Sequence, residues 1–304
     1  MPGPAALDGL RDSEFDWDMP LPIRDTMRAT ARLLVDRLFP GVGLWYRGKR
    51  DRRWLANPVR LKEGFQFCAP PSLRADGWET NERSVFDEAL RSADICVDAG
   101  ANVGFYACLA RSRGKHVLAI EPLAQNLSFL YRNLQINDFT DVEVFPLGLA
   151  SRPGIALIYG FSDIASFVPG WSAAADAKSE PVPLSTLDIL LGDRFAGRRL
   201  LIKVDVEGFE LDLLAGAERT LRMHPKPTWM VEILLENPLN GTVNGHFREV
   251  FDLFWRHGYR AWQIEDALRA VDEDTLARWV RDKTLGGSSP NFLFRARDTE
   301  GLGG

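Results

Sequence analysis

The distribution of hydrophobic and polar positions changes near residue 93, where short apolar runs begin to alternate with amphipathic stretches. Seven apolar runs lack the polar alternation of half-exposed strands, which is typical of strands buried on both faces. The helical segments between them predict a doubly wound α/β fold, in which ligands bind at the carboxyl ends of parallel strands. The seven predicted strands span residues 93–100, 116–122, 142–150, 200–208, 228–235, 259–265 and 291–297.

Apolar residues at helical spacing predict the connecting helices. These span residues 103–112, 124–137, 209–222, 246–257 and 272–283. Segment 151–199 departs from the pattern, because Pro, Gly and Ser are scattered among its short apolar runs. We interpret that segment as an insertion near the active face. A single α/β domain is therefore expected over residues 77–297, followed by a tail, 298–304.

Upstream of the predicted domain, residues 1–76 are expected to form a loose leader, an amphipathic helix and a basic stretch. Residues 24–39 have helical spacing, and Pro40-Gly41 is expected to end that helix. Five cations follow, flanked by tryptophan and tyrosine. Residues 24–54 could therefore touch an anionic membrane surface, or the basic stretch could bind an acidic acceptor or RNA. A solvated charged loop is the simpler alternative. The five cations are Arg47, Lys49, Arg50, Arg52 and Arg53.

Composition narrows the choice of partners and compartment. The 304 residues include 37 basic and 42 acidic ones, a net charge of −5, so a broad nucleic-acid-binding surface is not expected. The three cysteines form no CxxC pair, which favours a reducing compartment, and we expect the cytoplasm. No apolar run reaches the roughly 18 residues of a transmembrane helix. The oligomeric state stays open.

The most informative local motif is Val97-Asp98-Ala99-Gly100-Ala101-Asn102-Val103-Gly104, a strand that enters a glycine turn and then a helix. Glu121 ends the second strand, where an acid can accept hydrogen bonds from a ribose diol. Asn102 occupies the position of the middle glycine in a dinucleotide fingerprint, which disfavours NAD. Asp98 could hold an amino group. Together these residues favour S-adenosylmethionine as the cofactor.

Several motifs occur in the order VDAGANVGFYA, AIEP, VPLSTLD, IKVDVEGFELDLLAGA, WMVEI and NFLFRAR. In this combination the chain resembles the FkbM family of S-adenosylmethionine-dependent methyltransferases over roughly residues 77–297. The resemblance implies a class I methyltransferase fold, whose seven-stranded, Rossmann-like sheet has an antiparallel last strand. It also implies methylation of a hydroxyl group on a sugar, glycolipid or natural product. The cofactor site would comprise Asp98, Gly100, Asn102, Gly104, Phe105, Glu121 and Pro122.

Acidic residues at the ends of the fourth and fifth strands are the candidates for catalysis. Asp205, Glu207 and Glu232 should reach the sheet edge that holds the cofactor, and Lys203 should share a face with Asp205. We expect the first two to orient the acceptor hydroxyl, with one carboxylate taking its proton. Glu207 could instead cap the next helix, and His246 is a further candidate base. The three acids could also hold Mg²⁺, although no metal is expected to be required.

Alternatives from other functional classes remain. A nucleic-acid methyltransferase would share the cofactor loop, but strand four carries Asp205-Val206-Glu207 instead of an Asn-Pro-Pro-aromatic motif. A non-catalytic S-adenosylmethionine-binding protein would keep the loop and Glu121 without needing the acids. A dehydrogenase is disfavoured by the loop itself.

Overall fold

The computed structural model of the chain describes residues 40–75, 77–160, 165–171, 179–238 and 240–297. The chain divides into two compact units, residues 1–50 and 51–304. This division lies upstream of the predicted boundary at residue 77. The second unit includes strands β1 and β2 and helix η2, because Phe65, Phe67 and Leu73 belong to one of its hydrophobic cores. These elements span Val59–Arg60, Gln66–Phe67 and Pro71–Arg74.

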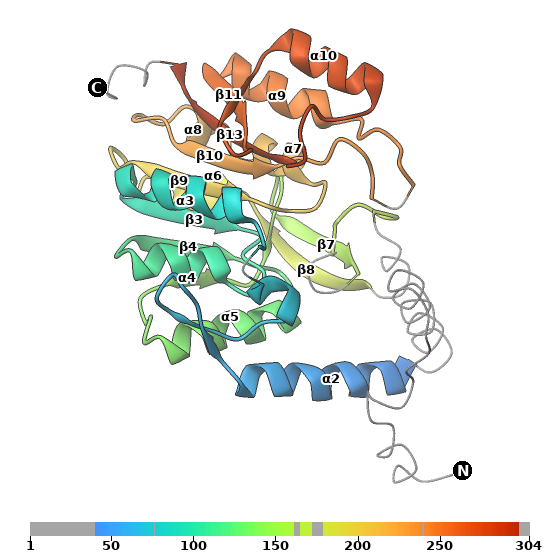
Figure 1. The fold of residues 1–304 in the computed structure, drawn as a ribbon. Coiled ribbons are helices and arrows are strands. Elements are labelled where there is room, and N and C mark those ends of the chain that lie inside the picture. Colours follow the sequence, from blue (N-terminus) through green and yellow to red (C-terminus); the bar gives the residue numbers. More distant parts are fainter. Residues whose placement is uncertain (1–39, 76, 161–164, 172–178, 239, 298–304) are drawn as a thin grey trace. The chain divides into compact units, whose positions relative to one another are not determined.

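The larger sheet contains eight strands within the described residues. In chain order they are β3 (Ile95–Ala99), β4 (His116–Ile120), β5 (Glu143–Phe145), β9 (Leu200–Val204), β10 (Thr228–Glu232), β11 (Tyr259–Gln263), β12 (Arg269–Val271) and β13 (Asn291–Ala296). Their spatial order is β12-β11-β13-β10-β9-β3-β4-β5. The neighbouring strands β10, β9, β3, β4 and β5 are parallel to one another. Strand β13 is antiparallel to both of its neighbours, β10 and β11. The predicted doubly wound fold is confirmed, and β12 adds an unpredicted edge strand (Figure 1).

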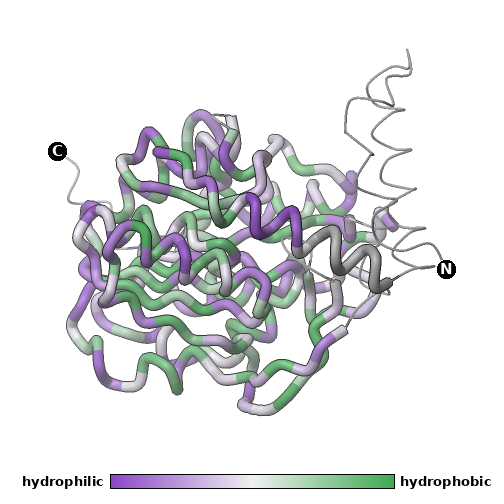
Figure 2. The backbone as a smooth tube through the Cα atoms, turned by 90° about the horizontal axis from the view of Figure 1, so that it is seen from below, coloured by the Kyte–Doolittle hydropathy of each residue, from purple (hydrophilic) through white to green (hydrophobic). Residues whose placement is uncertain are grey.

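Helices cover both faces of the larger sheet and produce two separate cores. One core joins the sheet to α3 (Thr80–Ser92), α4 (Phe105–Ser112) and α5 (Ala124–Ile136). The other joins it to α6 (Leu187–Leu191), α7 (Glu210–Ala215), α8 (Glu218–Leu221), α9 (Phe247–Arg256) and α10 (Glu273–Asp282). Strand β3 alternates between them, because Cys96 faces the first core and Val97 the second. Figure 2 shows hydrophobic and hydrophilic positions interleaved along the backbone, as expected for elements with one buried and one exposed face.

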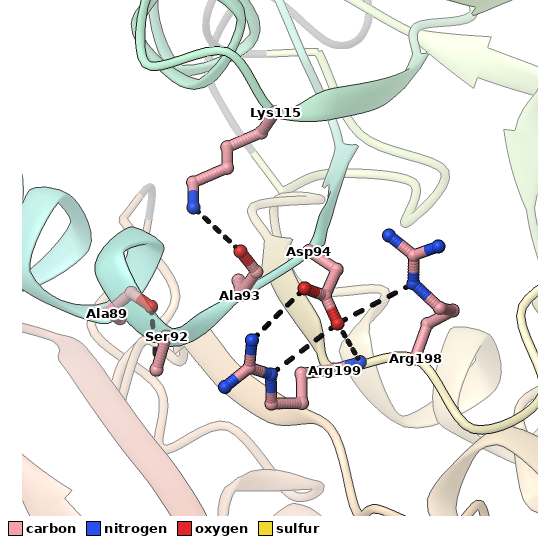
Figure 3. Close-up of polar contacts among 7 residues, drawn as sticks. All are labelled: Ala89, Ser92, Ala93, Asp94, Lys115, Arg198 and Arg199. Atoms are coloured by element: carbon pink, nitrogen blue, oxygen red, sulfur yellow. Dashed lines mark hydrogen bonds and ion pairs between the residues drawn. The ribbon is translucent and has the colours of Figure 1, made fainter.

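Ionic contacts pin the amino ends of β3 and β9 to each other, at the edge opposite the ligand-binding one (Figure 3). The Asp94 carboxylate accepts hydrogen bonds from the backbone N–H of Arg199 at 3.0 Å and from its guanidinium at 3.1 Å. These hydrogen bonds lower the pKa of Asp94 to about 2. Lys115 donates to the Ala93 carbonyl at 2.7 Å. The register of β3 against β9 is therefore set at this edge and carried through to the other.

Segment 142–199 differs from the predicted strand and insertion. The third predicted strand divides between two sheets at Pro146, which has no backbone N–H to donate to a neighbouring strand. The backbone N–H of Leu147 donates to the Phe145 carbonyl at 2.9 Å and forms a turn there. The second half of the predicted strand joins a three-stranded sheet of described residues with order β6-β8-β7. The predicted insertion therefore has a sheet of its own and ends in α6. The three strands are β6 (Gly148–Leu149), β7 (Gly154–Tyr159) and β8 (Ser179–Ser185).

Helix α2 (Pro40–Ala56) corrects the interpretation of the basic stretch. Pro40 begins this helix, as proline favours the first helical turn, whereas Pro40-Gly41 was expected to end an earlier one. The five cations therefore lie on a helix and not in a loop. The helix predicted over 24–39 and the tail 298–304 fall outside the described residues. None of the helices in the described ranges has both the length and the apolar composition needed to cross a membrane.

Two further differences concern helices. Helix α3 was not predicted at all. The helix predicted over 209–222 is two short helices, α7 and α8, separated at Gly216. A Cβ at Gly216 would lie 2.0 Å from the carbonyl oxygen of Ala150, so the backbone contact between these segments requires glycine. The interruption of the helix follows from that close approach.

Candidate active site

A cavity of about 370 Å³ lies at the carboxyl ends of β3, β4, β9 and β10. Its lining combines the loop after β3, the turn after β4, acids that follow β9 and β10, and apolar side chains from the smaller sheet and its neighbourhood. This is the edge at which open α/β sheets bind their ligands. The predicted site residues among the lining are Gly100, Asn102, Phe105, Glu121, Pro122, Lys203, Asp205, Glu207 and Glu232.

The loop between β3 and α4 is shaped by three alternate positions with left-handed backbone, residues 100, 102 and 104. Gly100 has φ +83°, and a Cβ there would lie 1.8 Å from the carbonyl oxygen of Asp205. Asn102 has φ +49°, a conformation that costs a residue with a Cβ roughly 1–2 kcal/mol. Gly104 has φ +89° and begins α4, where a Cβ would meet Leu130 Cδ1 at 2.4 Å. The loop therefore packs between β9 and α5 and is held open toward the cavity.

Glu121 ties this loop to the turn after β4. Its Oε2 accepts the backbone N–H of Asn102 at 2.8 Å, and its Oε1 accepts that of Leu123 at 2.9 Å. Asn126 Nδ2 donates to the same Oε1 at 3.2 Å. Burial raises the pKa of Glu121 to about 7, against the effect of these hydrogen bonds. Oε1 uses both of its lone pairs in these bonds, whereas Oε2 has one left and can also accept a hydrogen bond from a ligand.

Asp98 is not placed where the cofactor interpretation needed it. It is almost fully buried and does not belong to the described residues that line the cavity. Strand alternation puts it on the same face as its register partner Lys203, under the start of α4. Neither of its oxygens accepts a hydrogen bond of ordinary geometry from the described residues, and burial raises its pKa to about 6. A direct contact between Asp98 and a cofactor amino group is therefore not supported.

Lys203 and Asp205 form the ion pair that strand alternation predicts. Lys203 Nζ lies 2.7 Å from Asp205 Oδ2 and 4.6 Å from the centre of the Tyr106 ring. Lys203 is buried, and the negative charge of Asp205 is the main effect that opposes desolvation and raises its pKa. Among the described lining residues Lys203 is the one cation. It is therefore a fixed positive charge that holds Asp205 in place.

Glu232 ends β10 and lines the same cavity as this pair. Burial raises the pKa of Glu232 well above its ordinary value, and the negative charge of Asp205 raises it further. A carboxylate with a raised pKa is a stronger base than an ion-paired one once it is deprotonated. The raised pKa therefore makes Glu232 our candidate for the proton acceptor.

Glu207 does not cap the following helix. It has φ +50°, and its Oε2 accepts a hydrogen bond from the indole Nε1 of Trp171 at 3.0 Å. Its backbone carbonyl accepts from the Ser166 hydroxyl. Helix α7 begins after Phe209, without a side-chain cap. The insertion therefore orients Glu207 at the rim of the cavity.

His246 is not brought to the cavity. It precedes α9 with a side chain that is 62% exposed, and its nearest ionic partner is Glu249 at 3.4 Å. The magnesium alternative also lacks support, because no group of three His, Cys, Asp or Glu residues in the described part of the chain could hold a metal ion. The candidates for the base thus reduce to the carboxylates at the ends of β9 and β10.

Sequence reasoning missed part of the lining. Trp78 and Glu79 precede the recognised motifs, and both residues line the cavity. Asn126 supports Glu121 from the first turn of α5, a role without a motif of its own. The smaller sheet and its neighbours contribute apolar side chains that periodicity does not place: Leu123, Leu147, Leu149, Ile158, Ala165 and Phe167.

The residues present fit an S-adenosyl cofactor. Asn102 Oδ1 is buried without a hydrogen-bond partner among the described residues, so the loop retains an unused acceptor at the cavity. The lining carries five carboxylates and, among its described residues, a single cation, which suits a ligand with a sulfonium and an ammonium group. A pyrophosphate would be repelled by the same carboxylates. The five are Glu79, Glu121, Asp205, Glu207 and Glu232.

Comparison with known proteins gives a consistent result. A family model described as the methyltransferase FkbM domain matches residues 98–261. The chain is 23% identical over 190 residues to Methyltransferase 1 of Beauveria bassiana, covering 54% of this chain and 76% of that protein. It is 25% identical over 276 residues to the AMB antimetabolite synthetase AmbE of Pseudomonas aeruginosa, covering 72% of this chain but 13% of that protein. A SAM-dependent methyltransferase structure from Agrobacterium tumefaciens aligns with 10% identity and a TM-score of 0.41, covering 78% and 68% of the two chains.

Proposed function

The chain belongs to the FkbM family of S-adenosylmethionine-dependent methyltransferases, and on this premise we propose that its cavity methylates a hydroxyl group of a small molecule or glycan. One observation carries the proposal. The Gly100–Gly104 loop and Glu121 line the same cavity as Asp205 and Glu232, so cofactor and acceptor residues share one space.

For the cofactor, we assign the ribose hydroxyls to Glu121 and the adenine to the apolar side of the cavity. Support for the second assignment comes from Leu123 and Ile158, which form a small hydrophobic cluster with Phe167 packed against it. These side chains lie beside the turn that contains Glu121. Adenine and ribose are directly bonded to each other, so their two binding regions must be neighbours in this way. Pro122 continues the same wall.

When bound, S-adenosylmethionine supplies a methyl group activated by a sulfonium sulfur. The protein must bring an acceptor oxygen in line with that carbon and remove its proton. We assign proton removal to Glu232, because burial and the charge of Asp205 raise its pKa. Asp205, held by Lys203 at 2.7 Å, would accept a hydrogen bond from the acceptor and fix its orientation. Glu207 would orient the acceptor from the rim.

The acceptor class follows from the same lining. Several carboxylates offer hydrogen-bond acceptors to a polyol, and Trp78 adds an aromatic surface on which a sugar ring can pack. An anionic acceptor would meet like charges at Asp205 and Glu207. We therefore propose a neutral hydroxylated acceptor such as a sugar, a glycolipid headgroup or a natural product.

The first experiment is a calorimetric titration of the purified protein with S-adenosylmethionine, S-adenosylhomocysteine and NAD. We expect micromolar dissociation constants for the two sulfur nucleosides and no heat of binding for NAD. Transfer of a labelled methyl group to a panel of hydroxylated acceptors then tests the reaction. Binding of neither sulfur nucleoside would contradict the assignment of the cavity.

A further inference from the structure

Backbone strain points to a residue outside the recognised motifs. Three non-glycine residues in the left-handed region line the cavity within the described chain: Glu79 at φ +46°, Asn102 at φ +49° and Glu207 at φ +50°. Such conformations persist only where surrounding contacts hold them, and they are frequent at functional sites. The second and third belong to predicted motifs. Glu79 precedes the segment that the family model matches, residues 98–261.

The contacts of Glu79 direct its carboxylate into the cavity. Glu79 occupies the cap position of α3, yet its side chain makes no capping hydrogen bond with that helix. Its Oε2 instead accepts from the hydroxyl of Tyr106, in the first turn of α4 after the glycine loop. Its Oε1 has no hydrogen-bond partner among the described residues. The carboxylate is therefore anchored through one oxygen and presents the other.

Trp78, the residue before Glu79, is also held in place by contacts. Arg83 donates to the Trp78 carbonyl at 3.2 Å, and the Trp78 ring meets Phe105 edge to face at 5.1 Å between ring centres. Trp78, Phe105 and Tyr106 line the cavity around Glu79. A carboxylate among aromatic rings is a favourable environment for an organic cation. This part of the cavity, around Glu79, lies next to the start of α4. The amino-acid end of an S-adenosyl cofactor bound at the Gly100–Gly104 loop would lie there.

Three of the other acids in the cavity already have partners, and we assign the fourth, Glu232, to proton removal. Glu121 receives the backbone N–H groups of two neighbouring turns, and Asp205 is ion-paired with Lys203. Glu207 accepts from Trp171. Asp98, predicted to hold the amino group, is buried outside the lining. Burial also raises the pKa of Glu79, an effect that a bound cation would offset.

We propose that Glu79 binds the α-ammonium group of the cofactor, with Tyr106 as the positioning residue that aims its carboxylate. This inference rests on the proposed function, since it assigns one end of the same ligand. It transfers to Glu79 the role that the sequence motif suggested for Asp98. It also extends the cofactor site into a segment that the family model does not cover.

Two cofactor fragments separate this proposal from general damage to the site. S-adenosylhomocysteine contains the amino-acid end, whereas 5′-methylthioadenosine has the adenosine and sulfur without it. Calorimetry with Glu79→Gln should show at least tenfold weaker binding of S-adenosylhomocysteine and less than twofold change for 5′-methylthioadenosine. Tyr106→Phe should weaken the first about threefold and leave the second unchanged. Glu88→Gln, an exposed acid of the same helix, is the matched control and should change neither.

Each other outcome has a definite meaning. Unchanged binding of S-adenosylhomocysteine by Glu79→Gln would overturn the proposal, and so would an equal loss for both ligands. If Glu79→Gln does not fold, the selective loss expected for Tyr106→Phe decides the matter in the same way. Failure of the unmodified protein to bind either ligand would instead contradict the proposed function itself.

Discussion

The indole Nε1 of Trp171 donates a hydrogen bond to Oε2 of Glu207 across 3.0 Å, and so joins the insertion to the turn after β9. The Trp171 ring also fills the space beside Gly208, where a Cβ would lie 2.6 Å from it. Ser166 adds a hydrogen bond to the Glu207 carbonyl. The segment that departs from the strand–helix pattern therefore shapes the rim of the active site.

Trp171→Phe removes this indole N–H and keeps most of the ring. We expect kcat to fall about threefold to tenfold, in line with the loss of roughly 1 kcal/mol from one hydrogen bond. The dissociation constant of S-adenosylhomocysteine should stay within twofold. Labelled-methyl kinetics and calorimetry measure the two quantities. Trp255→Phe on α9 is the control, and equal effects of both substitutions on kcat would contradict the role of Trp171.

Glu232→Gln tests the assignment of the base. Glutamine keeps the shape of the side chain but cannot take a proton, so kcat should fall by about 10²–10⁴ while S-adenosylhomocysteine binds normally. Because the pKa of Glu232 is raised, the turnover of the unmodified protein should increase with pH as the carboxyl group loses its proton. A glutamine variant that retains normal turnover would exclude Glu232 as the base.

Cofactor affinity should depend on the charge of Glu121. With a pKa of about 7 in the empty site, Glu121 is largely protonated at pH 6 and ionised at pH 8. A protonated carboxyl group accepts fewer hydrogen bonds, so 5′-methylthioadenosine should bind about tenfold more weakly at pH 6. Glu121→Gln should bind weakly at both pH values. A pH dependence that survives in this variant would have to come from another group.

Glu210 should make the stability of the protein sensitive to pH. It is buried, accepts the Gly208 N–H at 2.8 Å, and has a pKa raised by burial to about 8 from an ordinary 4.5. Between these values the folded chain retains a proton that the unfolded chain has lost. The free energy of unfolding therefore decreases as pH rises through this window, by up to about 1.4 kcal/mol per pH unit.

Thermal unfolding of Glu210→Gln at pH 5 and pH 8.5 checks this sign. The variant cannot lose a proton, so its Tm relative to the unmodified protein should be higher at pH 8.5 than at pH 5. Glu218→Gln, an exposed acid of α8, should show no such difference between the two pH values. A constant Tm offset for Glu210→Gln would mean that Glu210 titrates alike in the folded and unfolded chains.

Gly100→Ala and Gly114→Ala separate backbone strain from steric overlap. Both glycines have positive φ, +83° and +76°, so each alanine should cost about 1 kcal/mol for its conformation. The Cβ at residue 114 meets no atom within 4 Å, whereas the one at residue 100 would lie 1.8 Å from the Asp205 carbonyl oxygen. Chemical denaturation should therefore show a much larger loss for Gly100→Ala, together with loss of cofactor binding. Similar losses for the two variants would contradict this packing.

The strands and their loop could be predicted because their signals are local. Apolar runs locate β3 and β9, and alternation correctly places Lys203 beside Asp205. Alternation also determines that Asp98 turns toward α4, but the sequence does not show that α4 closes that face above it. Pro40 illustrates a different limit, since proline is compatible with either end of a helix and only the following turn decides.

Contacts across long sequence separations could not be predicted in this way. Glu79 meets Tyr106 because α3 packs beside α4, and neither residue carries a motif for that contact. Phe167 lines the cavity from the segment between β7 and β8, which has no strong periodicity. His246 shows the reverse case, because a position after the fifth strand brings it near the correct edge while its side chain remains in solvent.

The pairing of β3 with β9 also affects how the chain folds during its synthesis. Their sequences, Ile95–Ala99 and Leu200–Val204, are separated by about a hundred residues, although the strands pair directly. At a synthesis rate of about 5–20 residues per second, one edge of β3 waits roughly 5–20 s for its partner. During that interval the growing chain has its glycine loop but not the Asp205 carbonyl that packs against Gly100. The packing around Gly100 is thus completed late in biosynthesis, and until then one edge of β3 is without its strand partner.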